Sequence, residues 1–443
     1  MKQFKLILSL LALFLFGLTG YSQNTPKFAE LKMSLSDFRQ SSGFFARYGL
    51  IRFSPDTKFL AVSGKAADII IYDIENGKIQ AKIDGSGFSA FSFLPDGKSV
   101  ILEESGHEYF KIFDYRTGQL LKTIDNTKGI SGFRRMTDAP NTLEMMSVTV
   151  TPDWKTLLVM RNTKEFQLTN LETGEKQFDI VHEKGYSSTW ELGKLIFAPT
   201  LSVLFQQNGG KFSPDGRFLV ITSGNRRPTL WNVKTGAKIG ELTPQDSFTN
   251  YANFSPDSKY AITYTTSGII GIWDSATGKL ISIIGNKQNR YIAYGGWIPN
   301  SQLIVVQRNK KDAEVFDALT GKLKFTMLKS DSAGAIPSKN GKYIFTVPRK
   351  DETKLFELWN AENGEFIASF PRVKADSPMT SLDWSPDGNF IMTASKKDVR
   401  IWNMKGELIQ ELENSQSPAR FSDDGKYIVT GSNKDTGLLW EIK

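Results

Sequence analysis

Five residues of this chain have side chains suited to recognising a ligand, and none of them occupies a repeated position. Arg134 and Arg135 stand side by side, and guanidinium groups bind carboxylates and phosphates through paired hydrogen bonds. His182 could bind a ligand or act as a general base. No other residue lies at a sequence spacing from it that would indicate a catalytic or binding pair. Tyr186 and Trp190 follow it and could stack on a sugar or a peptide. We take these five residues as candidates for binding a partner.

Other residues that could carry chemistry are few. The chain has no cysteine, which excludes thiol catalysis, disulfides and cysteine-based metal sites. Its two histidines, His107 and His182, leave little room for a histidine-rich metal site. The sequence shows no P-loop, no His-Glu-x-x-His, no EF-hand and no nucleophile elbow on a strand-to-helix turn. We therefore expect no catalytic residue, no metal site and no cofactor.

Two short motifs recur in phase along the chain and indicate the elements that must position these candidates. The first, a turn motif, has a Pro-Asp pair that suits a type I turn, because proline presets φ and aspartate bonds back to the backbone. The second, a strand motif, is an apolar run that ends in an aromatic residue and Asp or Asn. The turn motif begins at Ser54, Leu94, Thr151, Ser213, Ser255 and Ser385, and recurs without the Pro-Asp pair at Ile298, Ser338 and Ser422. The strand motif ends at Tyr72-Asp73, Phe113-Asp114, Trp231-Asn232, Trp273-Asp274, Phe316-Asp317, Trp359-Asn360 and Trp402-Asn403, and in variant form at Thr169-Asn170 and Trp440-Glu441.

This repetition gives the repeated residues a structural role. The aspartates of the turn motif could be taken for catalytic carboxylates, and the tryptophans of the strand motif for a ligand cage. Because both recur at the same place in successive units, we interpret them as turn residues and as packing residues. A period of about forty residues with short strands is typical of proteins built from stacked sheets.

The motifs resemble the repeats of the WD40 and YVTN families of β-propellers, and the resemblance covers Gly49 to Lys443. It implies an all-β fold, a single β-propeller of four-stranded antiparallel blades. Nine units are present, so we expect eight to nine blades. One departure is that the Gly-His dipeptide of many WD40 repeats occurs only once, at Gly106-His107. The hydrogen-bond network that this histidine supports in the family is therefore not expected throughout.

The ends of the chain indicate how the ring closes. The ninth unit supplies only three strands before Lys443, while an alternating apolar segment at Ala29–Leu35 has no unit of its own. We expect this N-terminal strand to complete the last blade. The repeats are also interrupted twice, at Asn126–Met146 and at His182–Gly210. Insertions in repeat proteins map to loops on one face, which is often the binding face.

The first 22 residues are typical of a signal peptide. Lys2 and Lys5 precede an apolar run from Leu6 to Leu18, and small residues surround the expected cleavage point after Ser22. We expect residues 23–443 to be exported to a periplasm or beyond. The absence of cysteine excludes a lipid anchor on that residue, and the apolar run is too short for a permanent membrane anchor.

These observations favour a non-catalytic, exported scaffold that binds one or more protein partners. The alternatives are a propeller enzyme or cofactor-binding ring with its site at the mouth of a central funnel, and a module that binds carbohydrate or a cell surface. Nucleic acid is not an expected partner, because the formal charge of +8 is spread along the chain without a basic run.

Overall fold

The computed structural model describes the chain in seventeen ranges that together hold the repeats. They are residues 27–36, 51–64, 68–86, 88–104, 109–125, 149–160, 165–181, 209–222, 227–243, 249–265, 268–285, 292–308, 312–327, 332–348, 356–370, 381–432 and 436–443. All regular structure in these ranges is β-strand. The expectation of an all-β protein is confirmed for them.

The strands form nine four-stranded antiparallel sheets, which we call blades 1 to 9 in chain order. The inner strands of blades 1 to 9 are β2 (Ile51–Phe53), β6 (Phe88–Phe93), β10 (Thr149–Val150), β14 (Gly209–Phe212), β18 (Thr249–Phe254), β22 (Ile292–Trp297), β26 (Ser332–Pro337), β30 (Ser381–Trp384) and β34 (Ser415–Phe421). The second strands are β3 (Phe59–Ser63), β7 (Ser99–Glu104), β11 (Thr156–Met160), β15 (Phe218–Thr222), β19 (Tyr260–Thr265), β23 (Leu303–Arg308), β27 (Tyr343–Pro348), β31 (Phe390–Ala394) and β35 (Tyr427–Ser432).

The third strands carry the strand motif, and the outer strands follow it. The third strands are β4 (Ile69–Asp73), β8 (Tyr109–Asp114), β12 (Glu165–Asn170), β16 (Thr229–Asn232), β20 (Ile270–Asp274), β24 (Ala313–Asp317), β28 (Phe356–Asn360), β32 (Val399–Asn403) and β36 (Gly437–Ile442). The outer strands are β5 (Ile79–Ile83), β9 (Leu120–Asp125), β13 (Lys176–Val181), β17 (Lys238–Glu241), β21 (Leu280–Ile284), β25 (Leu323–Met327), β29 (Phe366–Phe370), β33 (Leu408–Glu411) and, for blade 9, β1 (Ala29–Leu35).

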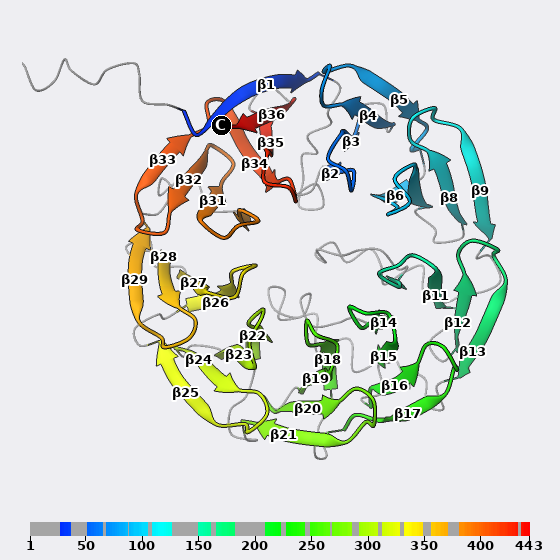
Figure 1. Ribbon diagram of the computed structural model, residues 1–443, viewed down its shortest axis with the longest axis vertical. Coiled ribbons are helices and arrows are strands. Elements are labelled where there is room, and N and C mark those ends of the chain that lie inside the picture. The colour runs from blue at the N-terminus through cyan, green and yellow to red at the C-terminus, as the bar shows by residue number, and fades with distance from the viewer. Residues whose placement is uncertain are drawn as a thin grey trace, which may run out of the picture.

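The blades stand around one axis as a closed ring, with the inner strands nearest the axis and the outer strands at the circumference (Figure 1). This is a nine-bladed β-propeller. Of the eight to nine blades expected, the structure has the higher number, because every one of the nine motif units forms a sheet.

The ring is closed by the N-terminal strand, as expected. β1 pairs antiparallel with β36, from Ala29 opposite Ile442 to Leu35 opposite Gly437. The side chain of Gln410, on β33 of blade 8, accepts a hydrogen bond from the Ala29 backbone N–H and donates one to the Ala29 carbonyl, each at 2.9 Å. At the other end of the chain, the Lys443 N–H donates to the Phe28 carbonyl over 3.0 Å. The closing strand is therefore tied both to its own blade and to the blade before it.

The hydrophobic core lies between neighbouring blades. One cluster joins Phe345 and Phe370 of blade 7 to Trp384 and Trp402 of blade 8, all buried. The ring centroids of Phe370 and Trp402 are 5.9 Å apart in an edge-to-face arrangement, which suits the aromatic quadrupoles. Because each sheet has two apolar faces, one blade alone could not bury them, and stacking into a ring solves the problem.

The tryptophans of the strand motif are packing residues, as predicted. In blades 5, 7, 8 and 9 the indole N–H donates to a threonine hydroxyl on the second strand of the same blade. The bond from Trp273 to Thr263 is 2.9 Å long, and the bond from Trp402 to Thr393 is 2.8 Å long. These bonds satisfy the buried indole donor within its own blade.

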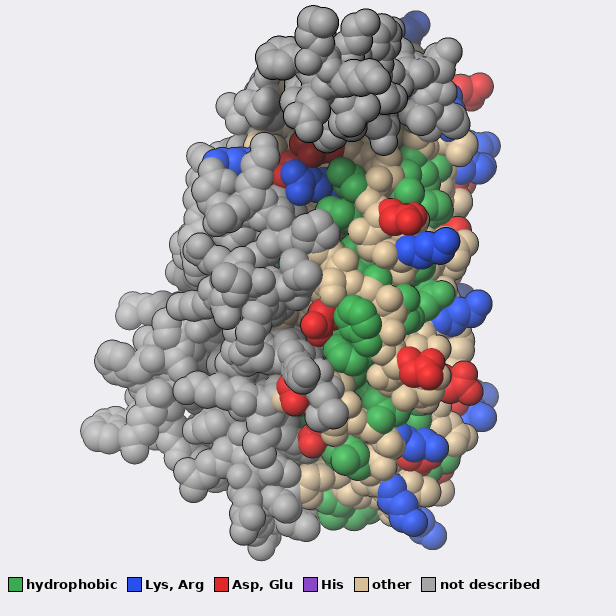
Figure 2. All heavy atoms as spheres, turned by 90° about the vertical axis from the view of Figure 1, so that its left-hand side faces the viewer, with side chains coloured by type: hydrophobic (Ala, Val, Ile, Leu, Met, Phe, Trp, Pro, Cys, Tyr) green, Lys and Arg blue, Asp and Glu red, His purple; other side chains and the backbone are tan. Residues whose placement is uncertain are grey.

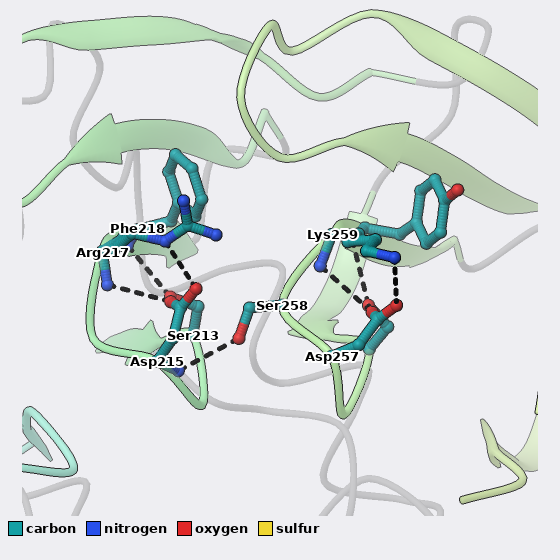
Figure 3. Close-up of polar contacts among 9 residues, drawn as sticks. Ser213, Asp215, Arg217, Phe218, Asp257, Ser258 and Lys259 are labelled. Atoms are coloured by element: carbon teal, nitrogen blue, oxygen red, sulfur yellow. Dashed lines mark hydrogen bonds and ion pairs between the residues drawn. The ribbon is translucent and has the colours of Figure 1, made fainter. Parts of the chain in front are cut away.

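The turn motif is stabilised by a repeated hydrogen-bond pattern. In blade 4 the Ser213 hydroxyl donates to Asp215 Oδ1 over 2.6 Å and accepts from the Phe218 N–H over 3.0 Å, and the Arg217 N–H donates to the same carboxyl oxygen (Figure 3). A hydroxyl-to-carboxyl bond of 2.6 Å recurs in blades 1, 3, 5 and 8. In blade 7 an asparagine replaces the aspartate, with a bond of 2.7 Å from Ser338 to Asn340.

Hydrogen bonds also join the turns of neighbouring blades. The Asp215 N–H of blade 4 donates to Ser258 Oγ of blade 5 over 3.0 Å (Figure 3). The Asn340 side chain of blade 7 donates to the Asp387 carbonyl of blade 8 over 3.2 Å. The turns thus reinforce the ring as well as each blade.

The carboxyl groups of five turns make stability depend on pH. Burial acts to raise the pKa of these groups, but hydrogen bonds from the hydroxyl and the backbone N–H outweigh it, so each pKa lies below its ordinary value. The residues are Asp56, Asp153, Asp215, Asp257 and Asp387. A lowered pKa gives stability that is complete above the unfolded value, about 3.9, and is lost as the pH falls through the folded pKa. We expect Tm to change little from pH 7 to 5 and to fall steeply below about pH 4.

Thermal unfolding followed by circular dichroism between pH 7 and pH 2.5 measures this dependence. The matched control is the triple variant D56N/D215N/D257N, which copies the native Ser338–Asn340 turn of blade 7. Its Tm is expected to fall less steeply with acid than that of the wild type. A wild-type profile that stays flat to pH 3, or the same acid slope in the variant, would contradict the prediction.

Candidate functional site

The two faces of the ring differ in the connections that they carry. Because the four strands of each blade alternate in direction, the turns between first and second strands and between third and fourth strands lie on one face. We call it the turn face. The connections between second and third strands, and those that lead from one blade to the next, lie on the opposite face, which we call the loop face.

All five sequence-predicted candidates lie outside the described residues. Arg134 and Arg135 belong to the segment that links β9 to β10, and His182, Tyr186 and Trp190 to the segment that links β13 to β14. Both links leave from and return to strand ends on the loop face. The predicted insertions are therefore attached to one face, but their own structure is not described. The second insertion is shorter than expected, since Gly209 and Gly210 belong to β14.

One set of inner-strand positions differs from the rest of the repeat. It lies two residues before the start of the turn motif, and we call it the axial position. From blade 1 to blade 9 its residues are Arg52, Ser92, Thr149, Lys211, Asn253, Gly296, Ile336, Asp383 and Arg420. The neighbouring turn residues repeat from blade to blade, whereas these do not. The inner strands that carry them surround the axis (Figure 1).

Two axial residues of adjacent blades converge on one tyrosine. Lys211 Nζ, from β14, donates to the hydroxyl of Tyr251 on β18 over 3.2 Å, and lies 5.2 Å from the centre of its ring. Asn253 Nδ2 donates to the same hydroxyl over 3.0 Å. All three side chains are half-buried. We call these three residues the axial cluster.

The position of Tyr251 is set by its own blade and by the next one. Its ring packs on Tyr264 of β19, with centroids 5.5 Å apart, and Tyr264 is almost fully buried. The ring of Tyr264 in turn occupies the space beside Gly295 of β22, where an added Cβ would lie only 2.5 Å from Tyr264 Cε1. The glycine is therefore required for the tyrosine pair, and the axial cluster rests on three consecutive blades.

The acidic axial residue has a different environment. Asp383 of blade 8 accepts hydrogen bonds of 2.9 Å from the backbone N–H groups of Trp384 and Phe421. Lys339 Nζ, from the turn of blade 7, lies 3.7 Å from Asp383 Oδ1. This carboxylate therefore helps to join three blades, which is a structural role.

The outer strands expose apolar side chains around the circumference of the ring. Figure 2 shows them beside charged residues on the blades that contain β25, β29 and β33. The exposed residues are Leu31, Ile79, Leu120, Leu121, Val181, Leu280, Ile281, Leu323, Phe366, Ile367, Leu408 and Ile409. Ten of these twelve residues are the first or second residue of an outer strand, directly after the third-to-fourth-strand turn. We interpret them as part of the architecture because, unlike the axial residues, they recur.

Two further searches cover the described part of the chain only. No group of three or more histidine and acidic side chains there could hold a metal ion. Within the same ranges no helix is long and apolar enough to cross a membrane.

Comparison with known proteins agrees with this geometry. The family model described as "WD domain, G-beta repeat" matches residues 364–403, which run from the outer strand of blade 7 to the third strand of blade 8. The C-terminal WD40 domain of Sif2 is 13% identical, with a TM-score of 0.52, over 95% of this chain and 100% of that domain. This chain contains a WD40 repeat and has the WD40-type propeller fold.

Other relatives of this WD40-type propeller are distant. The WD repeat-containing protein WDS homolog of Arabidopsis thaliana is 24% identical over 215 residues. That alignment covers 46% of the propeller chain and 40% of the relative, which is less than half of the relative's length. The crystal structure of a eukaryotic initiation factor is 14% identical with a TM-score of 0.61, over 88% of this chain and 90% of that one. At such identities the solved structures show the fold alone.

The axial cluster was missed by the sequence interpretation. The sequence does indicate the axial position, because the residue two places before each turn motif changes in type from blade to blade while the neighbouring turn residues repeat. The contact itself could not be read from the sequence, since Lys211 and Tyr251 belong to different blades and meet only when the inner strands are side by side.

Proposed function

We propose that this WD40-type propeller is an exported, non-catalytic scaffold that binds protein partners through its loop face. The observation that carries the proposal is the contrast between the faces. The turn face repeats the same hydrogen-bonded turn from blade to blade, whereas both insertions and their non-repeating residues attach to the loop face. A rigid frame with variable loops is the arrangement that recognition sites on such folds use.

The rigidity of the frame supports a scaffold role. The inter-blade bonds of the turn face, such as that from Asp215 to Ser258, and the packed aromatic cores between blades hold neighbouring blades in a fixed arrangement. A loop held at both ends by fixed strands loses less entropy when it binds, so affinity is gained by preorganisation.

Export rests on the sequence of residues 1–22, which has the charged start, apolar run and small-residue cleavage point of a signal peptide. We expect the native protein, recovered from the periplasm or the medium of its host, to begin at Gln23. Intact-mass spectrometry decides this. A native chain that still begins at Met1 would contradict export by cleavage.

The loop-face proposal is tested by affinity capture with matched variants. Wild type and the triple variant R134A/R135A/W190A are used to capture partners from nuclease-treated envelope and secreted fractions. Each recovered protein is then purified and titrated against both baits. We expect a partner whose affinity for the variant is at least about tenfold weaker, since the variant loses arginine and tryptophan anchors.

The control removes two cations and one aromatic residue elsewhere. Lys259 and Lys426 are strongly exposed in turns of the turn face, and Phe366 is exposed on β29. The variant K259A/F366A/K426A is expected to bind the partner as the wild type does. Equal binding of the partner by the wild type and R134A/R135A/W190A would refute the choice of face.

A further inference from the structure

The exposed apolar side chains of the circumference are spread unevenly around the ring. Seven of the twelve belong to four neighbouring blades, blades 5 to 8, whereas blades 3 and 4 together expose one, Val181, among the described residues (Figure 2). We call these seven residues the rim patch. They are Leu280, Ile281, Leu323, Phe366, Ile367, Leu408 and Ile409. Exposed apolar patches that are framed by polar residues mark sites of protein association.

The charges beside the rim patch change sign between blades 6 and 7. Between residues 317 and 327, blade 6 carries two lysines and one aspartate, and between residues 360 and 370 blade 7 carries two glutamates and no basic residue. The equivalent segments of blades 3 and 4 also differ in charge, but there the exposed apolar residues are almost absent. The apolar positions recur around the ring, whereas their combination with this reversal of charge belongs to blades 6 and 7. The four charged side chains that we consider are all exposed, namely Lys322, Lys324, Glu362 and Glu365.

These charges are not neutralised by one another within the molecule. In the described part of the chain, no ion pair joins the lysines of blade 6 to the glutamates of blade 7. Lys324 acts on the carboxylate of Asp317, and Glu365 accepts a hydrogen bond from Asn363 Nδ2 over 2.9 Å. With the aspartate counted and the asparagine neutral, blade 6 stays net positive and blade 7 net negative.

A surface with opposite charges on its two halves is complementary to a second copy of itself. A two-fold axis parallel to the ring axis, just outside the boundary of blades 6 and 7, brings blade 6 of each copy against blade 7 of the other. The lysines then face the glutamates twice, and the apolar residues of the two copies cover each other. We propose that the rim patch and its flanking charges form the interface of a homodimer.

The aromatic residue at the centre of this interface is held in place. Phe366 is 52% exposed, and its ring packs edge-to-face on Trp359 of β28 with centroids 5.5 Å apart. The turn before it rests on blade 6, since a Cβ added at Gly364 would lie 2.4 Å from Phe325 Cδ2. The two halves of the surface are therefore fixed relative to each other, and little entropy is lost when a second copy binds.

The shape of the ring limits the contact. Because the circumference is convex, blades 6 and 7 make the direct contact and blades 5 and 8 only flank it. Small interfaces of this kind are weak, so we expect a dissociation constant of about 1–100 μM. The arrangement leaves both loop faces uncovered and on the same side of the dimer. The proposal is therefore independent of the partner proposed above.

Sedimentation velocity of the native protein, purified from its host, tests for the dimer between about 1 and 500 μM. We expect a reversible equilibrium between monomer and dimer. The variants K322E/K324E and E362K/E365K each place like charges opposite one another, and each should weaken dimerisation at least about tenfold. F366S, which removes the aromatic anchor and keeps every charge, should weaken it to a similar degree.

Exchange of the charges separates this dimer from any other. An equimolar mixture of K322E/K324E and E362K/E365K again has opposite charges at both contacts and should dimerise, as should the variant that carries all four substitutions. The controls K234E/K238E, on blade 4, and E172K/E175K, on blade 3, change the net charge equally at exposed positions and should dimerise as the wild type does. An unchanged Tm shows that a variant is folded.

Each other result overturns the proposal. A wild type that stays monomeric throughout the range would do so, as would a dimer that both charge reversals leave intact. Failure of the folded mixture to dimerise would show that blades 6 and 7 do not face each other. A monomeric wild type from which K322E/K324E loses a captured envelope protein would assign the surface to that protein in place of a second copy.

Discussion

Removal of residues 25–35 is expected to lower Tm by about 10 °C or more, because it takes away the outer strand of blade 9. The deletion removes the pairing from Ala29–Ile442 to Leu35–Gly437 and the two bonds from Gln410. Ala29 and Leu35 are fully buried in two different inter-blade cores. Burial of one leucine contributes about 1.5–3 kcal/mol, and with the lost strand bonds we expect a cost of at least about 5 kcal/mol. At about 2 °C per kcal/mol, this gives the stated change.

Differential scanning calorimetry of the wild type and the deletion variant measures the change. The matched control is L31S, since Leu31 lies on the same strand but is 52% exposed. It should leave Tm within about 1 °C of the wild-type value. If the deleted protein does not fold, a synthetic peptide of residues 25–35 added during refolding should restore the native spectrum. An unchanged Tm after deletion would show that the strand does not close the ring.

Substitution of Gly341 by alanine is expected to cost about 3–5 kcal/mol of unfolding free energy, which is large for one methyl group. Gly341 ends the turn of blade 7 with a φ of +73°, a conformation that side chains disfavour. An added Cβ would also lie 1.8 Å from the Pro299 carbonyl oxygen of blade 6. Because that atom is backbone, the turns of two blades would have to separate.

The chain supplies a matched control for this effect. Gly97 ends the equivalent turn of blade 2 with a φ of +67°, but an added Cβ there meets no atom within 4 Å. G97A should therefore cost only the backbone strain, about 1 kcal/mol. Chemical denaturation of both variants gives the comparison. Equal losses would mean that the turns of blades 6 and 7 are not in contact, contrary to the structure.

Most of the fold could be predicted from the sequence because its information is repeated nine times. Single motifs are weak, and the units at Thr151–Asn170 and Pro337–Asn360 depart furthest from the pattern. They still form blades 3 and 7, since the phase of their neighbours and the ring geometry override their local sequence. The closing strand was predictable too, because Ala29–Leu35 was the one alternating segment without a unit.

The site could not be predicted in the same way, because recognition residues are those that do not repeat. Sequence interpretation directed attention to Arg134 and Trp190 in the insertions, which lie outside the described residues. It passed over Lys211 and Tyr251, whose contact arises from the lateral packing of two inner strands. Such a contact depends on which side chains of adjacent blades face each other, and the spacing of motifs along one chain does not encode it.

The pairing of β1 with β36 also constrains how the molecule can be made. Among the described strands, β1 lies earliest in the chain and pairs with β36, which lies latest, so blade 9 cannot be completed until β36 has been synthesised. Each of blades 1 to 8 is formed by a continuous stretch of chain, whereas ring closure requires the strand pairing of greatest sequence separation. We therefore expect ring closure to be a late step of folding, before which β1 and one edge of β36 are unpaired and open to association with other strands.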